Sequence, residues 1–128
     1  MSNRAIISTP TAPDAIGPYS QAVKVENTLY LSGQIAINPA TGSMVNDSIE
    51  NETKQIMENI GHVLEAAGMD FTNLFKCSIF LKDMDNFSSV NEVYGSYFSS
   101  DFPARECVQV AKLPKNVNVE ITALAADK

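Results

Sequence analysis

Apolar residues recur at every second position in three parts of the chain, and this alternation predicts β-strands. Segment 21–37, QAVKVENTLYLSGQIAI, contains two alternating runs that flank the turn-forming pair Glu26-Asn27, so it predicts a hairpin. Segment 74–82, LFKCSIFLK, predicts a single strand. Segment 103–121, PARECVQVAKLPKNVNVEI, alternates on both sides of the turn sequence LPKN and predicts a second hairpin that closes the chain.

Apolar residues spaced three and four apart predict two helices. The first runs from 49 to 67, with Asp47 or Ser48 as its N-cap and Gly68 as its stop. The second begins near Asp85. One side of this second helix is apolar along its length: Phe87, Val90, Tyr94, Tyr97 and Phe98. Each helix therefore has one face to bury, and the predicted sheet offers the surface for it.

The order of these elements, ββαβαββ, predicts an α+β fold, a two-layer sandwich in which two helices cover one face of a mixed β-sheet. The chain has 128 residues, the length of one domain, so residues 1–128 are expected to form a single domain around one core. Two helices leave the other sheet face uncovered, and that face carries too many apolar residues for contact with water. We therefore expect it to meet another subunit.

Composition and charge exclude several classes of protein. Hydrophobic residues make up 45% and charged residues 19% of the chain, which fits a globular protein. The net charge is −6 and the 9 lysines and arginines are scattered, so nucleic acid is not an expected partner. No apolar run approaches the roughly 18 residues of a membrane span, and no secretory signal is visible. The expected location is therefore cytoplasmic, without a membrane partner.

Metal and thiol chemistry find little support in the sequence. A single histidine and the absence of a closely spaced cysteine pair argue against zinc, so no metal or other cofactor is expected. Cys77 and Cys107 are expected to be reduced thiols. Cys77 falls in an apolar stripe and is expected in the core. Cys107 has no histidine near it in the sequence and His62 lies mid-helix, which argues against a Cys–His nucleophile.

The closing hairpin carries an arginine and a glutamate that a core hairpin does not need. If its valines face the helices, Arg105 and Cys107 point to the opposite face together with Glu120. Hairpin pairing then places Glu120 about four residues, or ~13 Å, along the sheet from Arg105. Arginine suits a carboxylate because its planar fork makes two charge-assisted hydrogen bonds, and a partly buried glutamate can act as a general base. On spacing alone, surface salt bridges are the simpler interpretation, with Asp101 as the partner of Arg105.

Two earlier segments carry residues that suit ligand binding. Tyr19 follows Gly17-Pro18 in an irregular segment, where its side chain either fills a gap or offers its hydroxyl to a ligand. Ser32 and Gly33 lie at a strand end, where glycine permits a ligand to approach the backbone N–H groups closely. Neither segment decides a function by itself.

Four segments together resemble the RidA (YjgF-type) family, the reactive-intermediate deaminases, also called 2-iminobutanoate/2-iminopropanoate deaminases. They are GPYSQAV (17–23), SGQI (32–35), NEVY (91–94) and PARECVQVAKLP…VEI (103–121). The resemblance covers essentially the whole chain in the family's order, and the last block is the specific one. It implies a chorismate-mutase-like homotrimer with clefts between subunits, which would cover the apolar sheet face.

The resemblance also implies roles for particular residues. The family's carboxylate-binding arginine falls on Arg105 and its water-positioning glutamate on Glu120. The other matches line the cleft, and they are Tyr19, Ser32, Gly33, Asn91 and Cys107, the last of which binds ligand mainly through its backbone. One position departs from the family, because the residue after the arginine is usually small and here is Glu106. Alternation points Glu106 away from Arg105, so we expect the site to survive, while the added charge leaves the substrate range open.

The function that the resemblance implies is hydrolysis of reactive 2-imino acids, the products of pyridoxal-phosphate-dependent dehydratases, to 2-oxo acids and ammonia. Arg105 would anchor the substrate carboxylate, and Glu120 would hold and partly deprotonate a water molecule. No metal is needed because a protonated imine is already a strong electrophile. Two other classes stay open. One is a non-catalytic module that binds small carboxylates, and the other is an RNA-cleaving translation inhibitor, against which the acidic charge counts.

Overall fold

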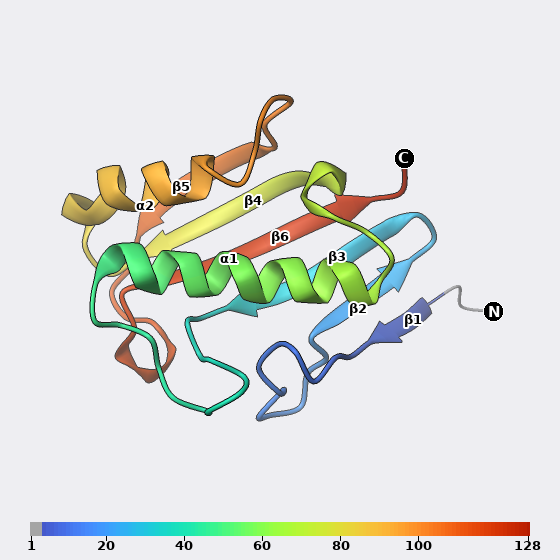
Figure 1. Ribbon diagram of the computed structural model, residues 1–128, viewed down its shortest axis with the longest axis horizontal. Helices are drawn as coiled ribbons and strands as arrows, with labels where there is room; N and C mark the ends of the chain where they lie inside the picture. The colour runs from blue at the N-terminus through green and yellow to red at the C-terminus, as the bar shows by residue number, and fades with distance from the viewer. Residues whose placement is uncertain (1–3) are drawn as a thin grey trace.

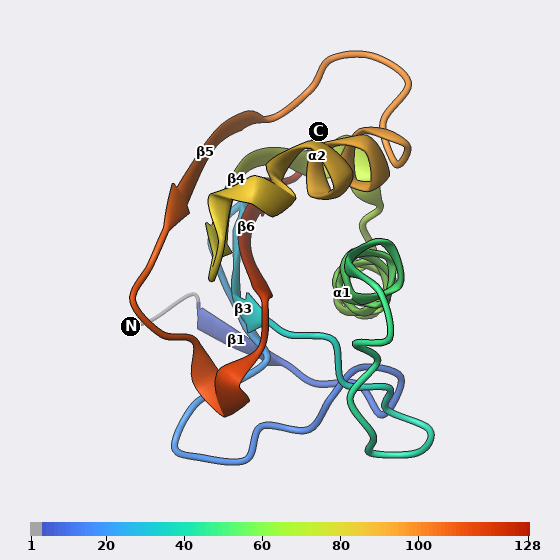
Figure 2. The same ribbon diagram turned by 90° about the vertical axis from the view of Figure 1, so that its left-hand side faces the viewer.

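Two helices pack against one face of a six-stranded sheet in the computed structural model, which describes residues 4–128 (Figure 1). The strand order is β1-β2-β3-β6-β4-β5, with β4 and β5 parallel and the other neighbours antiparallel. The strands are β1 (Arg4–Ile7), β2 (Ala22–Val25), β3 (Thr28–Gln34), β4 (Leu74–Leu81), β5 (Ala104–Gln109) and β6 (Val119–Ala126). Seen edge-on, both helices lie on the same side of the sheet (Figure 2). The predicted α+β sandwich with a mixed sheet is confirmed.

The longer helix, α1 (Ile49–Ala66), has the ends that its sequence predicts. The Ser48 hydroxyl accepts a hydrogen bond from the backbone N–H of Asn51 at 3.0 Å, and Gly68 follows the helix with a φ of +74°. Its apolar stripe is buried, including Ile56, Met57, Ile60, Val63 and Leu64. This stripe packs over β3 and β6 and forms the centre of the core (Figure 1).

The shorter helix, α2 (Phe87–Gly95), begins after a 3-10 turn at Met84–Asn86, close to the predicted start. It ends before Tyr97 and Phe98, which nevertheless pack against the core from the segment that follows. The helix connects β4 to β5 and lies beside them (Figure 1). Its position decides what surrounds the edge strand β5.

The predicted closing hairpin is wrong, because β5 does not pair with β6. β5 pairs in parallel with β4, in a register that sets Arg105 beside Cys77 and Cys107 beside Ile79, whereas β6 inserts between β3 and β4. The helix α2 between β4 and β5 provides the crossover that a parallel pair requires. The connection at 110–118 then carries the chain past the end of β4 to β6.

The first hairpin is present as predicted, and one further strand accompanies it. β2 and β3 pair in antiparallel fashion, with Glu26 at the turn in the left-handed region at a φ of 54°. Strand β1 is absent from the prediction. It consists of the four residues RAII, pairs only with β2 at the edge of the sheet, and lacks the alternation of a half-buried strand.

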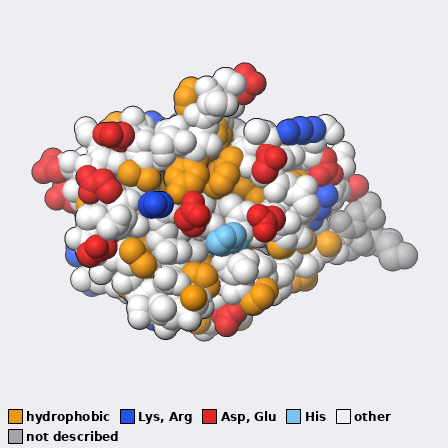
Figure 3. All heavy atoms as spheres, in the orientation of Figure 1, with side chains coloured by type: hydrophobic (Ala, Val, Ile, Leu, Met, Phe, Trp, Pro, Cys, Tyr) orange, Lys and Arg blue, Asp and Glu red, His pale blue; other side chains and the backbone are white. Residues whose placement is uncertain are grey.

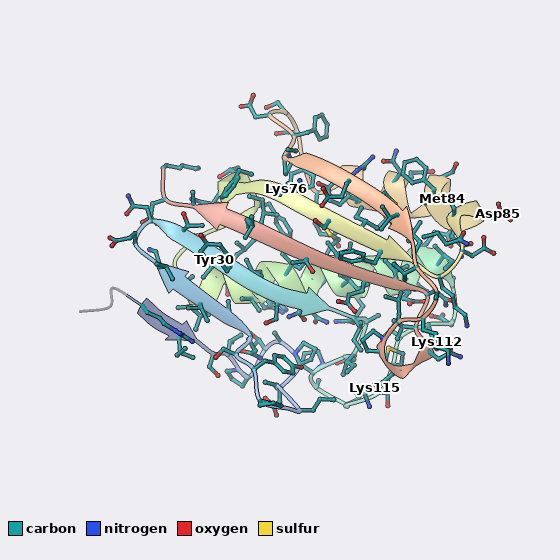
Figure 4. All side chains as sticks on the ribbon, turned by 180° about the vertical axis from the view of Figure 1, so that it is seen from behind. Tyr30, Lys76, Met84, Asp85, Lys112 and Lys115 are labelled. Atoms are coloured by element: carbon teal, nitrogen blue, oxygen red, sulfur yellow. The ribbon has the colours of Figure 1, made fainter. Side chains whose placement is uncertain are left out.

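The sheet face opposite the helices is apolar, and we call it the open face. Register and alternation place many apolar side chains on it, among them Ile6, Val23, Val25, Tyr30, Phe80, Val108 and Leu124. Tyr30 is 49% and Val108 42% exposed. Figure 4 looks onto this face, with Tyr30 of β3 and Lys76 of β4 labelled. Among residues 4–128, no helix has the length and apolar character needed to cross a bilayer.

Candidate active site

Side chains of α2 hold Arg105 on the edge strand β5. Its Nη1 donates a hydrogen bond to Asn91 Oδ1 at 2.6 Å. Its Cζ lies 5.2 Å from the centroid of the Tyr94 ring and 5.5 Å from that of the Phe87 ring. A guanidinium over an aromatic ring gains about 0.5–1 kcal/mol per ring at an exposed site. These contacts orient the guanidinium while Arg105 remains exposed, so its other N–H groups can bind a ligand.

The spacing of these partners along the chain is a signal in the sequence that our prediction did not include. Phe87, Asn91 and Tyr94 follow one another at intervals of four and three, so they share one helix face. Two of them, Asn91 and Tyr94, also line a hollow that we call the arginine half-site, together with Gly95, Phe102, Pro103 and Arg105. The ion pairs within residues 4–128 are Lys24–Asp127 and Lys76–Glu106. The proposed Arg105–Asp101 salt bridge is not among them, so that simpler interpretation is wrong.

Glu120 lies in a second hollow, where β3 and β6 meet the N-terminal loop. This cavity of about 460 Å³, which we call the glutamate half-site, is lined by residues that include Pro13, Ile16, Tyr19, Ser32, Gly33, Pro114 and Glu120. Glu120 is half-buried, and this desolvation raises the pKa of its carboxyl above the ordinary glutamate value. A carboxylate with a raised pKa is a stronger base than an exposed one, which suits proton abstraction from water.

A bulge in β3 makes room for the Glu120 side chain. The register between β3 and β6 shifts between Leu31 and Gln34, so β3 carries an extra residue at Ser32-Gly33. A Cβ added to Gly33 would lie 2.2 Å from Oε2 of Glu120. The glycine therefore admits the carboxylate itself, whereas the sequence led us to expect a ligand in that space.

Ser32 and Tyr19, which were also predicted to line the site, differ in whether their hydroxyls are available to a ligand. The Ser32 hydroxyl donates to the carbonyl of Ser20 at 2.6 Å, which ties β3 to the loop that carries Tyr19. Its proton is thus used inside the chain, and only acceptor capacity is left for a ligand. Tyr19 is 52% exposed and lines the hollow, so its ring and hydroxyl are accessible.

Neither cysteine has the surroundings of a nucleophile. Cys77 is buried in the core, as predicted. Cys107 is half-buried on the helix-covered face, and burial raises the pKa of its thiol although the charge of Arg105 acts in the opposite direction. The thiol is therefore the prevailing form at neutral pH, whereas the thiolate is the form that attacks an electrophile.

Arg105 and Glu120 of one chain lie on opposite faces of the sheet, contrary to the predicted parity. Arg105 lies beside buried Cys77 on the helix-covered face, whereas Glu120 lies beside Phe80 on the open face. Two strand spacings across the sheet and three residues along it separate their Cα atoms by about 14 Å. Side chains that diverge from such a distance cannot hold one small molecule between them. The predicted facing of Arg105 was wrong because it assumed that β5 pairs with β6. In the structure, pairing with β4 determines which side chains of β5 face the helices.

Glu106 points away from Arg105, as alternation predicts, and it is paired on the open face. Its carboxylate accepts hydrogen bonds from Lys76 Nζ at 2.8 Å and from the Ser78 hydroxyl. The bond from Lys76, followed by that from Ser78, lowers the pKa of the Glu106 carboxyl, so it is ionised at neutral pH. The charge that departs from the family pattern is thus paired with a lysine and lies on the face of the sheet opposite to the Arg105 side chain.

Comparisons with known proteins agree with this architecture. A protein of the Rid family from Yersinia pestis superposes with a TM-score of 0.94 at 46% identity, covering 97% of this chain and 99% of that one. The Escherichia coli protein TdcF, solved with bound serine, has a TM-score of 0.93 at 38% identity and covers 97% and 99% of the two chains. A protein of Bos taurus named 2-iminobutanoate/2-iminopropanoate deaminase is 55% identical over 122 residues, which are 95% of this chain and 89% of that protein.

Residues 9–127 match the family described as Endoribonuclease L-PSP, and the chain belongs to this family, the YjgF/RidA family. The resemblance seen in its sequence segments is therefore confirmed at the level of the family.

Proposed function

We propose that this protein is a cytoplasmic deaminase that hydrolyses 2-imino acids to 2-oxo acids and ammonia, with Arg105 and Glu120 as its catalytic residues. The observation that carries the proposal is the half-buried Glu120 carboxylate, whose desolvation raises its pKa and whose side chain lies over Gly33. Two comparisons support it. The Bos taurus relative bears the deaminase name, and the E. coli relative binds serine, whose carboxylate is a group that an arginine fork recognises.

The two half-sites can act on one substrate when they come from different copies of the chain. The open face carries Glu120 together with exposed apolar residues such as Tyr30 and Val108, the kind of surface that marks a subunit interface. In the proposed homotrimer the open face packs against neighbouring copies. The glutamate half-site of one chain then meets the arginine half-site of the next, in a closed ring of equal contacts. The number three comes from the family resemblance.

The first step is attack by water on the protonated imine. Arg105 binds the substrate carboxylate through two parallel hydrogen bonds, and its contacts with α2 keep the fork aimed. Glu120 accepts a proton from the water molecule while the water oxygen forms a bond to C2 of the imine. The electron pair of the C=N bond moves to nitrogen. The result is a tetrahedral carbinolamine and a neutral Glu120.

The second step returns the proton and expels ammonia. The neutral Glu120 protonates the amine nitrogen, the C–N bond breaks, and the hydroxyl oxygen forms the C=O bond of the 2-oxo acid. The hydroxyl proton passes through the regenerated Glu120 carboxylate to the departing ammonia or to solvent. The protonated imine is electrophilic by itself, so the chemistry requires positioning and one base. The base contributes about 10²–10⁴-fold to the rate.

The experiment that tests this proposal generates 2-iminopropanoate and 2-iminobutanoate in situ with a pyridoxal-phosphate-dependent dehydratase. The release of 2-oxo acid is timed with no added protein, with the wild type and with Glu120→Gln. We expect the wild type to accelerate release and the variant to match the spontaneous rate. A wild-type protein that binds 2-oxo acids but leaves the spontaneous rate unchanged would instead be the binding module.

RNA cleavage is a second candidate because the family bears the description Endoribonuclease L-PSP. The net charge of −6 counts against it, and acidic side chains are spread across the helix-bearing face (Figure 3). Phosphate contacts weaken steeply as salt is added, so a salt titration of RNA binding separates the two functions. We expect no RNA binding at physiological salt.

A further inference from the structure

A glutamate of α1 is buried in the core next to the start of β6. Glu52 lies in the first turn of the helix, and its relative exposure to solvent is 0%. A carboxylate in such a place is strongly destabilising unless hydrogen bonds satisfy its oxygens. An apolar residue would fill this position in the buried stripe more simply. The contacts of the two oxygens therefore indicate a task beyond packing.

Both oxygens accept hydrogen bonds from residues 118 and 119. Oε2 accepts from the backbone N–H of Asn118 at 2.9 Å and from that of Val119 at 3.1 Å. Oε1 accepts from Asn118 Nδ2 at 2.8 Å. The Asn118 carbonyl in turn accepts from the backbone N–H of Lys82, just after β4, at 3.0 Å. Glu52 thus joins α1 to the two residues that directly precede Glu120.

The turn before these two residues has strained backbone. Lys115 and Asn116 have φ values of 53° and 56°, in the left-handed region that residues other than glycine rarely adopt. Such a conformation persists only where neighbouring contacts hold it. Pro114 of the same turn lines the hollow that contains Glu120. The hydrogen bonds that Glu52 accepts lie between the strained turn and Glu120, so a shift at 118–119 would move both Pro114 and Glu120, which line the glutamate half-site.

We propose that Glu52 is a positioning residue for Glu120; this inference rests on the proposed function, in which Glu120 is the base. Glu52 holds the backbone at Asn118 and Val119, and strand alternation projects the next side chain to the other face of the sheet, over Gly33. The arginine half-site is built from α2 and β5 instead. Glu52 therefore acts on turnover and leaves carboxylate binding unchanged.

The test replaces Glu52 in the full chain by methionine, which fills a similar volume and cannot accept these hydrogen bonds. NMR titration of the Glu120 carboxyl carbon, assigned with the Glu120→Gln variant, reports its surroundings without relying on activity. Asp14 and Tyr19 are the other titratable groups that line this hollow. In Glu52→Met we expect the Glu120 pKa to return toward its ordinary value as the carboxyl gains water. We also expect kcat to fall about 10-fold at an unchanged KM, because small displacements of a catalytic group slow the chemical step.

Thr53→Val is the matched control. Thr53 is the next residue of α1, is equally buried, and donates its hydroxyl to the carbonyl of Ile49 at 2.8 Å within the helix. This variant should lose thermal stability and keep the wild-type kcat and Glu120 titration. If Glu52→Met does not fold, Glu52→Asp keeps the carboxyl group on a side chain that is one methylene shorter. It should show the same two changes to a smaller extent.

A folded Glu52→Met or Glu52→Asp protein with the wild-type Glu120 titration overturns the proposal. Equal changes in Thr53→Val also overturn it, because they would reduce the role of Glu52 to general stability. Failure of the proposed function has a different signature, which is wild-type imine hydrolysis by Glu120→Gln. In that case the titration still decides whether Glu52 positions Glu120.

Discussion

The arginine half-site and the glutamate half-site are built in different ways. Arg105 is oriented by side chains of α2, because it donates one hydrogen bond to Asn91 and makes two ring contacts. Glu120 depends on backbone, because its carboxylate occupies the space above Gly33 in the bulge of β3. Several side-chain contacts orient Arg105, and they can compensate in part for the loss of one of them. The position of the Glu120 carboxylate depends on one feature, the space above Gly33. Binding should therefore tolerate small changes near Arg105, whereas turnover should respond strongly to small changes near Glu120.

The largest effect is expected from Glu120→Gln, which keeps the shape of the side chain and removes the base. We expect kcat for imine hydrolysis to fall ~10²-fold or more, while the Kd for an inert 2-oxo acid stays the same. The wild type supplies the pH control. Burial raises the Glu120 pKa, so activity should decline as pH falls through a value above that of an ordinary glutamate, with the neutral form inactive. An equal loss of binding and turnover would contradict this separation of roles.

Arg105→Lys should give the next effect, on binding. Lysine keeps the charge but loses the planar fork and its two parallel bonds to a carboxylate. A lost charge-assisted hydrogen bond is worth about 1.5–3 kcal/mol, so the Kd for 2-oxo acids should rise roughly 10–150-fold. Isothermal titration with a 2-oxo acid measures this, and the KM for the imine should rise in parallel. A wild-type Kd would place the carboxylate somewhere other than at Arg105.

Gly33→Ala tests whether the Glu120 carboxylate needs the space above Gly33. Its added Cβ would lie 2.2 Å from Oε2 of Glu120, so the carboxylate has to move. We expect kcat to fall by about 10-fold, since displacements near 1 Å can slow a reaction up to 10²-fold. The Kd for 2-oxo acids should change little because Arg105 is not displaced. Near-wild-type turnover, with the fold verified by circular dichroism, would show that Glu120 can act without the space above Gly33.

Glu106→Ala should have the smallest effect. The variant restores the small residue usual in the family and removes the partner of Lys76 on the open face. Because Glu106 points away from Arg105 and its charge is balanced by Lys76, we expect kcat/KM for both imines to change less than about threefold, within the range of weak ion pairs. A larger gain for one imine would assign substrate discrimination to this position.

The sequence predicts the local features of this fold well. Both ends of α1 follow from Ser48 and Gly68, because caps and stops are set by neighbouring residues. The partner of β5 is a non-local property, and alternation alone fixes the facing of Arg105 only after that partner is known. The order β4–α2–β5 is the available signal for a parallel pair, and it outweighs the turn-like sequence before β6.

The site shows the same division between local and non-local information. The residues themselves could be named in advance from their resemblance to a family. The position of the Glu120 carboxylate over Gly33 could not be predicted, because it arises between two strands that are distant in sequence and depends on a register shift. The contacts of Arg105 with Phe87 and Tyr94 were open to prediction from helical spacing once β5 was placed beside α2.

The central claim is that one active site combines Arg105 of one copy with Glu120 of another. Mixed assemblies of Arg105→Ala and Glu120→Gln chains, made in equal amounts by co-expression with two different tags, test it most directly. Each parent variant alone should be nearly inactive. After purification through both tags every trimer contains both kinds of chain, and in a closed ring one of its three sites then has both wild-type groups, so about a third of the wild-type turnover should return. Mixed assemblies no more active than the average of the two parents would contradict the claim.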